Sequence, residues 1–294
     1  MVMNVVVCVK QVPDNKNPVQ IDKDSGLINA DNLVYVTNPS DLTAVKWAAN
    51  QKEKDTSGEV TVVTVGLPSA QKVLRECFAY GADRALLLHD PSFENSDGYA
   101  TGVILSKTIQ LLQYDIVLCG VQSADTNAGW VGSIVAHKLG IPLISRIIDI
   151  QVQNDEKKLI VQRRLDGINR EIVEVMVPCL LTIDPLLDSP RYPSIRSIRA
   201  AQKREIEQHN RASLGLSLEE VGYAGSKTHY IKLSVNKPRP KKIFTPESSL
   251  PAAERIRLVM SGGITGKKDN RLTGSPAELA SKLVQFFRQE KIIR

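Results

Sequence analysis

The chain has 294 residues, enough for one large or two modest domains, each with its own core. With 42% hydrophobic and 24% charged residues and no apolar run near 20 residues, the composition is that of a globular protein and excludes a membrane-spanning helix. The net charge of +6 invites a nucleic-acid interpretation, but only 5% of residues are aromatic and no stacking residues accompany the basic clusters. We therefore expect a basic face for an acidic protein partner and no nucleic-acid binding.

The N-terminal run MVMNVVVCVKQ has no basic start and no small-residue cleavage site, so it predicts a first strand rather than a signal peptide. The four cysteines, Cys8, Cys77, Cys119 and Cys179, show neither a zinc-binding nor a CxxC spacing. We expect reduced thiols in the core and a cytoplasmic protein.

Strand and helix patterns alternate along the first half of the chain. Strands are predicted at 4–12, 59–66, 84–90 and 114–120, and helices follow each of them. The first helix is expected to have Ser40 as its N-cap and Ala44, Trp47 and Ala48 on one face, and the second to end at a left-handed Gly81. This alternation predicts a doubly wound, mostly parallel α/β sheet whose ligands lie beyond the carboxyl ends of the strands.

From residue 141 the pattern changes to an antiparallel extension, with turns at 154–158 and 167–169 and a last strand at 170–184. A proline-marked exposed loop, 184–200, then leads into a basic helix. We expect an α/β domain at 1–236 and a C-terminal arm at 237–294 that ends in an amphipathic helix, with Ser275 as N-cap, Pro276 in its first position and Glu278 completing a capping box.

The most informative stretch is GVQSADTNAGWVGSIVAHKLG, residues 120–140, where a buried strand stops at a polar, glycine-bearing loop that re-enters as a helix. Unpaired N–H groups at a helix N-terminus favour a phosphate, although an ordinary βα turn explains the glycines equally well. The loop matches neither GxGxxG nor GxxxxGK[ST]. We expect the loops at 10–13, 65–68 and 120–129 to converge on one crevice.

No catalytic constellation can be assembled. The four histidines are scattered, His137 is expected at the surface, and no paired carboxylates or nucleophile elbow are present. SGGITG at 261–266 lacks the Asp-Ser of ATP pyrophosphatases and predicts a hinge. The sequence therefore favours a site that binds and positions a ligand over one that breaks bonds.

Several motifs, in order along about two thirds of the chain, resemble the β subunit of electron transfer flavoproteins. They are VCVKQVPD (7–14), NPSD (38–41), YGADRALLL (80–88), GVQSADTNAGWVG (120–132), RRLDGINREIVEVMVPCLLTI (163–183) and DSPRYPSIRSI (188–198). The resemblance implies an adenine-nucleotide α-hydrolase-like domain without enzymatic chemistry, paired with an α subunit that carries the redox-active FAD. The β subunit of most members holds AMP as a structural ligand, and in electron-bifurcating members a second FAD takes that place.

The resemblance also implies a set of nucleotide contacts, with Asp125, Asn127 and the N–H groups of Gly129, Trp130 and Val131 toward the phosphate. The full set is Cys8, Val9, Asn38, Pro39, Ser40, Asp41, Val65, Gly120, Gln122, Asp125, Asn127, Gly129, Trp130 and Val131. Trp130 stands where many relatives have Gln, and SADTNAGWVG fits the bifurcating pattern poorly, so AMP is favoured over FAD.

The segment PRYPSIRSIRAAQK resembles the family's recognition loop, which docks acyl-CoA or other dehydrogenases. Its anchor would be Ile195, rather than Leu186 or Leu187, ringed by Arg191, Arg196 and Arg199. The arm would wrap the α subunit, and its extra residues at 237–272 would contact α or a membrane quinone reductase. Two alternatives remain: a stand-alone adenine-nucleotide sensor, and an ATP-using ligase or pyrophosphatase.

Overall fold

The computed structural model describes residues 3–17, 33–54, 58–153, 157–187, 192–229, 231, 245–260 and 274–289. The chain divides into two units, Met1–Val235 and Asn236–Arg294, which are treated separately. Within the described residues, no helix combines the length and the apolar character needed to cross a membrane.

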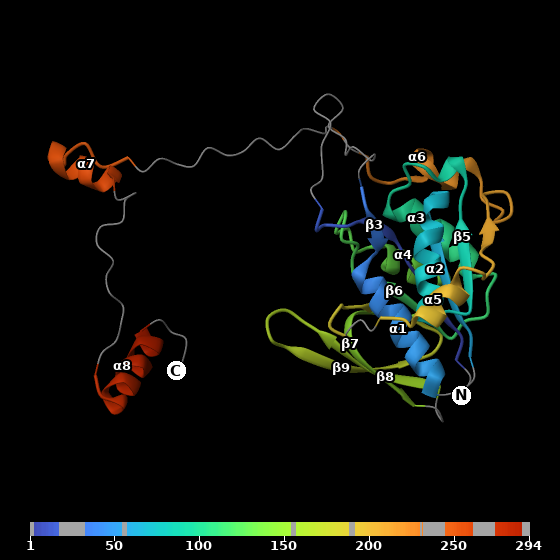
Figure 1. The fold of residues 1–294 in the computed structure, drawn as a ribbon, viewed down its shortest axis with the longest axis horizontal. Helices are drawn as coiled ribbons and strands as arrows, with labels where there is room; N and C mark the ends of the chain where they lie inside the picture. The colour runs from blue at the N-terminus through green and yellow to red at the C-terminus, as the bar shows by residue number, and fades with distance from the viewer. Residues whose placement is uncertain are drawn as a thin grey trace. The chain divides into compact units, whose positions relative to one another are not determined.

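A nine-stranded sheet forms the first unit, in the order β11-β5-β4-β1-β6-β10-β7-β8-β9 (Figure 1). Every pair from β11 to β7 is parallel, and β8 and β9 extend the sheet as an antiparallel edge. The strands are β1 Val5–Cys8, β4 Val60–Val65, β5 Arg84–Leu88, β6 Ile116–Gly120, β7 Leu143–Gln153, β8 Lys158–Arg164, β9 Arg170–Met176, β10 Cys179–Ile183 and β11 Glu207–His209. The predicted fold class, a doubly wound and mostly parallel sheet with an antiparallel extension, is confirmed.

Helices cover both faces of this sheet, because the side chains of a central strand alternate between two apolar cores. Val5 and Val7 of β1 pack with helices α1 and α2, whereas Val6 and Cys8 pack with α3 and α4 (Figure 1). The helices of the first unit are α1 Pro39–Lys54, α2 Gln71–Tyr80, α3 Gly98–Ile109, α4 Val131–Leu139, α5 Ile195–Ala201 and α6 Gly222–Gly225. Short 3₁₀ turns lie at Pro68–Ala70, Pro91–Phe93 and Leu218–Glu220.

Several local predictions are confirmed. Ala44, Trp47 and Ala48 are buried on one face of α1, and α2 ends at Gly81 with a left-handed φ of 120°. A turn joins β8 to β9, closed by the Leu165 N–H donating to the Asn169 carbonyl at 3.0 Å. All four cysteines are free and buried, and His137 is exposed on α4.

The first strand was predicted too long. β1 ends at Cys8, and β2 (Gln11–Pro13) leaves the main sheet to pair antiparallel with β3 (Tyr35–Thr37). The prediction of Ser40 as N-cap was also wrong, because α1 already begins at Pro39 and Ser40 lies buried in its first turn. The apolar pattern of the first strand continues past Cys8, where β1 ends. The helix signal at Ser40 comes one residue after α1 has begun.

The strand predicted at 170–184 is two strands. β9 pairs antiparallel with β8 and ends at Met176, and β10 returns to the parallel sheet between β6 and β7; the Val177-Pro178 peptide between them is cis. β10 is completely buried. The sequence pattern did not show where the break falls, because the alternating run REIVEVM passes directly into the apolar run CLLTI across Val177 and Pro178.

The second unit contains α7 (Ala252–Met260) and α8 (Pro276–Gln289). The predicted start of α8 is confirmed: the Ser275 N–H donates to Glu278 Oε2 at 2.9 Å, and the Glu278 N–H donates to Ser275 Oγ at 3.4 Å. The apolar side chains of α8 remain partly exposed, among them Leu283, Val284 and Phe286. SGGITG, at 261–266, lies outside the described residues.

Candidate nucleotide site

The carboxyl ends of β1, β4 and β6 lie side by side, because β1 pairs in parallel with both of the other strands. The loops that follow them meet as predicted. Gln11, after β1, exchanges hydrogen bonds with Ser69 of the loop after β4, at 3.1 and 3.2 Å. Asn15 Nδ2 donates to the Ala124 carbonyl, in the loop after β6, at 3.4 Å.

The candidate nucleotide residues therefore gather at one edge of the sheet. Cys8, Val65 and Gly120 end the three strands, and Pro39, Ser40 and Asp41 form the first turn of α1. Val9 and Asn38 directly follow β1 and precede α1. The remaining residues form the loop before α4 and the start of that helix: Gln122, Asp125, Asn127, Gly129, Trp130 and Val131.

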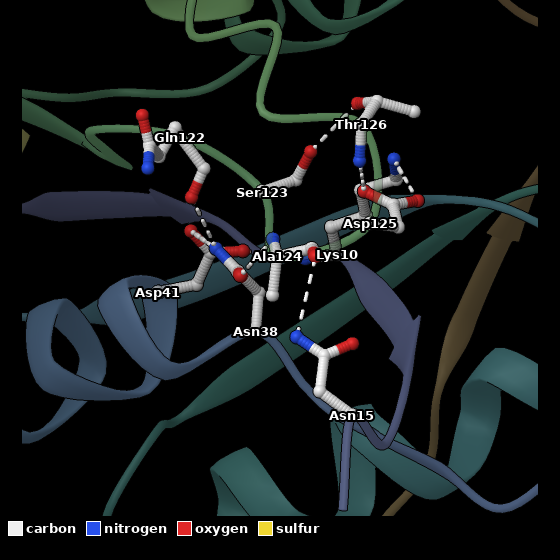
Figure 2. A network of polar contacts seen from close by, with 9 residues as sticks. All are labelled: Lys10, Asn15, Asn38, Asp41, Gln122, Ser123, Ala124, Asp125 and Thr126. Atoms are coloured by element: carbon white, nitrogen blue, oxygen red, sulfur yellow. Dashed lines mark hydrogen bonds and ion pairs between the residues drawn. The ribbon is translucent and has the colours of Figure 1, made fainter. Parts of the chain in front are cut away.

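The Asp41 carboxylate is buried at the centre of this cluster (Figure 2). Its Oδ2 accepts the Lys10 N–H at 2.8 Å, and its Oδ1 accepts the Gly120 N–H at 2.9 Å and Asn38 Nδ2 at 3.0 Å. One side chain thus joins the ends of β1 and β6 to the start of α1.

Gly120 is required by this close approach. A Cβ at that position would lie 2.1 Å from Asp41 Oδ1 and 2.8 Å from Ser40 Cβ. The absence of a side chain lets the end of β6 donate its N–H directly to the carboxylate.

Asn38 secures the loop after β6 with both halves of its amide. Its Nδ2 donates to the Gln122 carbonyl and its Oδ1 accepts the Ala124 N–H, each at 3.0 Å (Figure 2). Its own N–H donates to the Lys10 carbonyl at 2.9 Å. Asn38 and Asp41 therefore connect the end of β6 and its loop to the backbone of Lys10, after β1.

An ion pair joins the loop after β1 to the loop after β6. Lys10 Nζ lies 2.6 Å from Asp125 Oδ2, and Asp125 Oδ1 accepts the Thr126 N–H at 2.7 Å (Figure 2). The sequence predicted Asp125 toward a phosphate and did not single out Lys10 or Asn15. The VKQVPD motif contains Lys10, but nothing in its spacing indicates which loop the side chain reaches.

The loop enters α4 through two left-handed residues, Asn127 at φ 52° and Gly129 at φ 67°. Trp130 then takes the N-cap position, and its side chain makes no capping hydrogen bond. By contrast, α3 is capped by Asp97, which accepts the N–H groups of Tyr99 and Ala100 at 2.9 Å. Helix α4 thus begins without the side-chain acceptor that a helix N-terminus usually carries.

Two glycine contacts fix the orientation of α4. The Trp130 indole packs on Gly98 at the start of α3, where an added Cβ would lie 2.5 Å from the indole Nε1. Gly132 faces β10, where an added Cβ would lie 3.0 Å from Thr182 Cγ2. The start of α4 is therefore held between α3 and the carboxyl end of β10.

These features fit the phosphate end of an adenine nucleotide. A glycine-lined loop leads to an uncapped helix N-terminus, where unpaired N–H groups and the helix dipole favour an anion. Asp125 adds a negative charge nearby, but Lys10 offsets it. AMP and the adenylate half of FAD present the same phosphate to such a cradle, so the residues fit either ligand.

The recognition-loop candidates lie apart from this cluster in the sequence and on a separate helix. Ile195 is the first residue of α5 and is 72% exposed, and Arg196 and Arg199 are exposed on the same helix. Leu187 packs against the core, whereas Leu186 is exposed. Arg191 lies outside the described residues.

Comparison with known proteins agrees with this arrangement. A family model described as the electron transfer flavoprotein domain matches residues 26–214. The electron transfer flavoprotein subunit beta of Thermoanaerobacterium thermosaccharolyticum is 40% identical over 245 residues, which cover 83% of this chain and 92% of the relative. The chain belongs to the electron transfer flavoprotein β-subunit family.

Other members of this β-subunit family carry names that refer to larger assemblies. The caffeyl-CoA reductase-Etf complex subunit CarD of Acetobacterium woodii is 38% identical, over 78% of this chain and 87% of the relative. The acryloyl-CoA reductase electron transfer subunit gamma of Anaerotignum propionicum is 32% identical, over the same two shares. The family is one of flavoproteins that transfer electrons.

Asp41 gives this β subunit a testable pH dependence. Burial raises the pKa of the Asp41 carboxyl from 3.8 to about 7, although hydrogen bonds from Asn38, Lys10 and Gly120 act to lower it. Since the pKa is raised on folding, this group's contribution to stability is fully present below about pH 4 and is lost as the pH rises through 7.

We expect Asp41→Asn to remove this contribution. The unfolding free energy of the wild type relative to the variant should fall by about 1 kcal/mol per pH unit between pH 5 and 7, measured by urea denaturation. Asp166→Asn is the control, because the Asp166 side chain is fully exposed. Parallel curves for wild type and Asp41→Asn would contradict the assignment.

Proposed function

We propose that this chain is the β subunit of a heterodimeric electron transfer flavoprotein and that it holds AMP as a structural ligand. The observation that carries the proposal is the glycine-lined, uncapped N-terminus of α4, fixed in place by Asn38 and Asp41. A bound nucleotide stabilises such a domain by mass action. The subunit supports the FAD of the α subunit and positions it for electron transfer, without catalytic residues of its own.

The polar groups at the centre of the site support a positioning role. Both oxygens of Asp41 and both ends of the Asn38 amide are engaged in holding backbone segments together. A group that holds three segments in register cannot also turn toward a substrate. The buried free thiols are consistent with a reducing, cytoplasmic setting.

The second candidate is a bifurcating β subunit with a second FAD in place of AMP. It is favoured by the relatives named as electron-transfer subunits of CoA reductases. The family resemblance favours AMP, because it implies Gln in many members where this chain has Trp130, the N-cap of α4.

The surface of the chain supports two partner contacts. Ile195 is exposed at the start of α5, next in the chain to the exposed Arg196 and three residues after the 91% exposed Tyr192. An exposed apolar residue with charged neighbours is the pattern of an anchor with a charged rim, which suits a dehydrogenase partner. In the second unit, α8 keeps a partly exposed apolar stripe that includes Leu283 and Phe286. We assign this unit as an arm that wraps the α subunit, since an amphipathic helix is stabilised mainly by burying such a stripe.

The composition of the complex tests the function directly. Co-expression with the α subunit, gentle purification and denaturation should release one FAD and one AMP per heterodimer, quantified by chromatography. Two FAD and no AMP would replace the proposal by its bifurcating alternative. A chain that purifies without an α subunit and binds adenine nucleotides alone would support a sensor, and turnover of ATP would support a ligase or pyrophosphatase.

The glycines on either side of α4 offer a matched pair of variants that test the proposed AMP site. Gly129 and Gly140 flank the helix with nearly the same φ, 67° and 68°, but a Cβ would meet the Val121 carbonyl oxygen at 3.2 Å only at Gly129. Alanine at either position should cost about 1 kcal/mol of stability through backbone strain. Gly129→Ala should also release most of the nucleotide, while Gly140→Ala keeps it. Equal nucleotide content in both purified complexes would show that the loop is not the cradle.

Ile195→Ala should raise the KM of a partner dehydrogenase for the complex about tenfold, as expected for a contact worth about 1–2 kcal/mol. Flavin content should stay at the wild-type level, because Ile195 lies on the exposed side of α5. Leu111→Ala, which truncates another exposed side chain, serves as the control. A parallel loss of flavin and electron transfer in Ile195→Ala would rule out a docking role.

A further inference from the structure

The backbone of Lys10 is held in place by hydrogen bonds at both its N–H and its carbonyl group. Its N–H donates to Asp41 Oδ2 at 2.8 Å, and its carbonyl accepts the Asn38 N–H at 2.9 Å. Asp41 is buried, so the backbone of Lys10 is fixed from the interior on both sides. The side chain, 45% exposed, extends from this fixed point across the loop that precedes α4 (Figure 2).

The partner of Lys10 is the carboxylate of Asp125, in the loop proposed to hold the nucleotide. Asp125 lies in the loop that leads into the uncapped N-terminus of α4. Although partial burial acts to raise the pKa of Asp125, hydrogen bonds from Lys10 and Ser123 and the Lys10 charge hold it below its usual value. The carboxylate is therefore charged, and by itself it would repel a phosphate bound at the same helix end.

A phosphate bound in this loop would compete with Asp125 for the ammonium group of Lys10. A Lys side chain is a flexible point charge with three donors, suited to move between two nearby anions. The ion pair is partly exposed, so breaking it costs little, whereas a phosphate carries more charge than a carboxylate. The backbone anchor of Lys10 does not depend on which anion its side chain contacts.

We propose that Lys10 is a phosphate ligand of the nucleotide, and that Asp125 holds its ammonium group over the cradle until the nucleotide binds. On binding, Lys10 Nζ exchanges Asp125 Oδ2 for a phosphate oxygen. This inference rests on the proposed nucleotide site and adds to it a cation, in a loop that lacks the lysine of the GxxxxGK[ST] pattern. It requires that the negative charge of Asp125 weakens phosphate binding, although Asp125 belongs to the loop that forms the site.

The test uses the heterodimer stripped of its nucleotide and titrated calorimetrically with AMP and with adenosine. Lys10→Met should weaken AMP binding at least tenfold and change adenosine binding less than twofold, because adenosine lacks the phosphate. Lys10→Arg should recover most of the AMP affinity. Lys16→Met removes one charge from an exposed position after β2 and should change neither affinity.

Asp125→Asn separates the exchange from a purely structural role of the ion pair. It keeps an oxygen that can accept the Thr126 N–H, and removes the competing charge, so AMP should bind severalfold more tightly. Weaker AMP binding in this variant would overturn the exchange, because that result is expected if the Lys10–Asp125 ion pair only stabilises the loop. Equal AMP affinity of wild type and Lys10→Met would overturn the role of Lys10. If the wild type bound neither AMP nor adenosine, the nucleotide site itself would be wrong.

Discussion

The carboxylate of Asp41 is the constraint on which the candidate site depends. Three N–H donors reach it from the end of β1, the end of β6 and the residue before α1. Because the group is buried, leaving any of these donors without its acceptor would cost about 1–3 kcal/mol. Asp41 thereby fixes the point at which the loop after β6 begins, and Asn38 and the Lys10–Asp125 ion pair hold the loop beyond it.

A buried carboxyl with a pKa near neutrality resembles a catalytic base. Both oxygens of Asp41, however, already accept backbone N–H groups, from Lys10 and from Gly120. Its raised pKa is better explained as the cost of placing an acceptor where three segments meet. The same logic applies to Asn38, whose amide is used at both ends. Both side chains therefore hold backbone segments in position.

The sequence predicted the fold and the convergence of the loops after β1, β4 and β6, because both depend on local patterns. Apolar runs separated by helical spacing indicate parallel strands, and the glycine loop at 120–132 marks the end of β6. Lys10 could not be predicted as a contact of Asp125, since an exposed lysine in a loop has the same local sequence whether it is solvated or paired. The path of β10 was equally hidden, because its place between β6 and β7 is decided by pairing with β6, far back in the chain.

The placement of β10 also sets an order of events during synthesis. The Val121 N–H donates to the Ile183 carbonyl, and Gly132 packs on Thr182, so the loop before α4 rests on a strand that the ribosome makes much later. Until the β7–β9 extension has been made and β10 has returned, the far edge of β6 has no neighbour. Such pairing between distant segments is slow to form and leaves a strand edge open to wrong contacts. We therefore expect the loop before α4, and with it the proposed nucleotide site, to be completed only after β10 has joined the sheet.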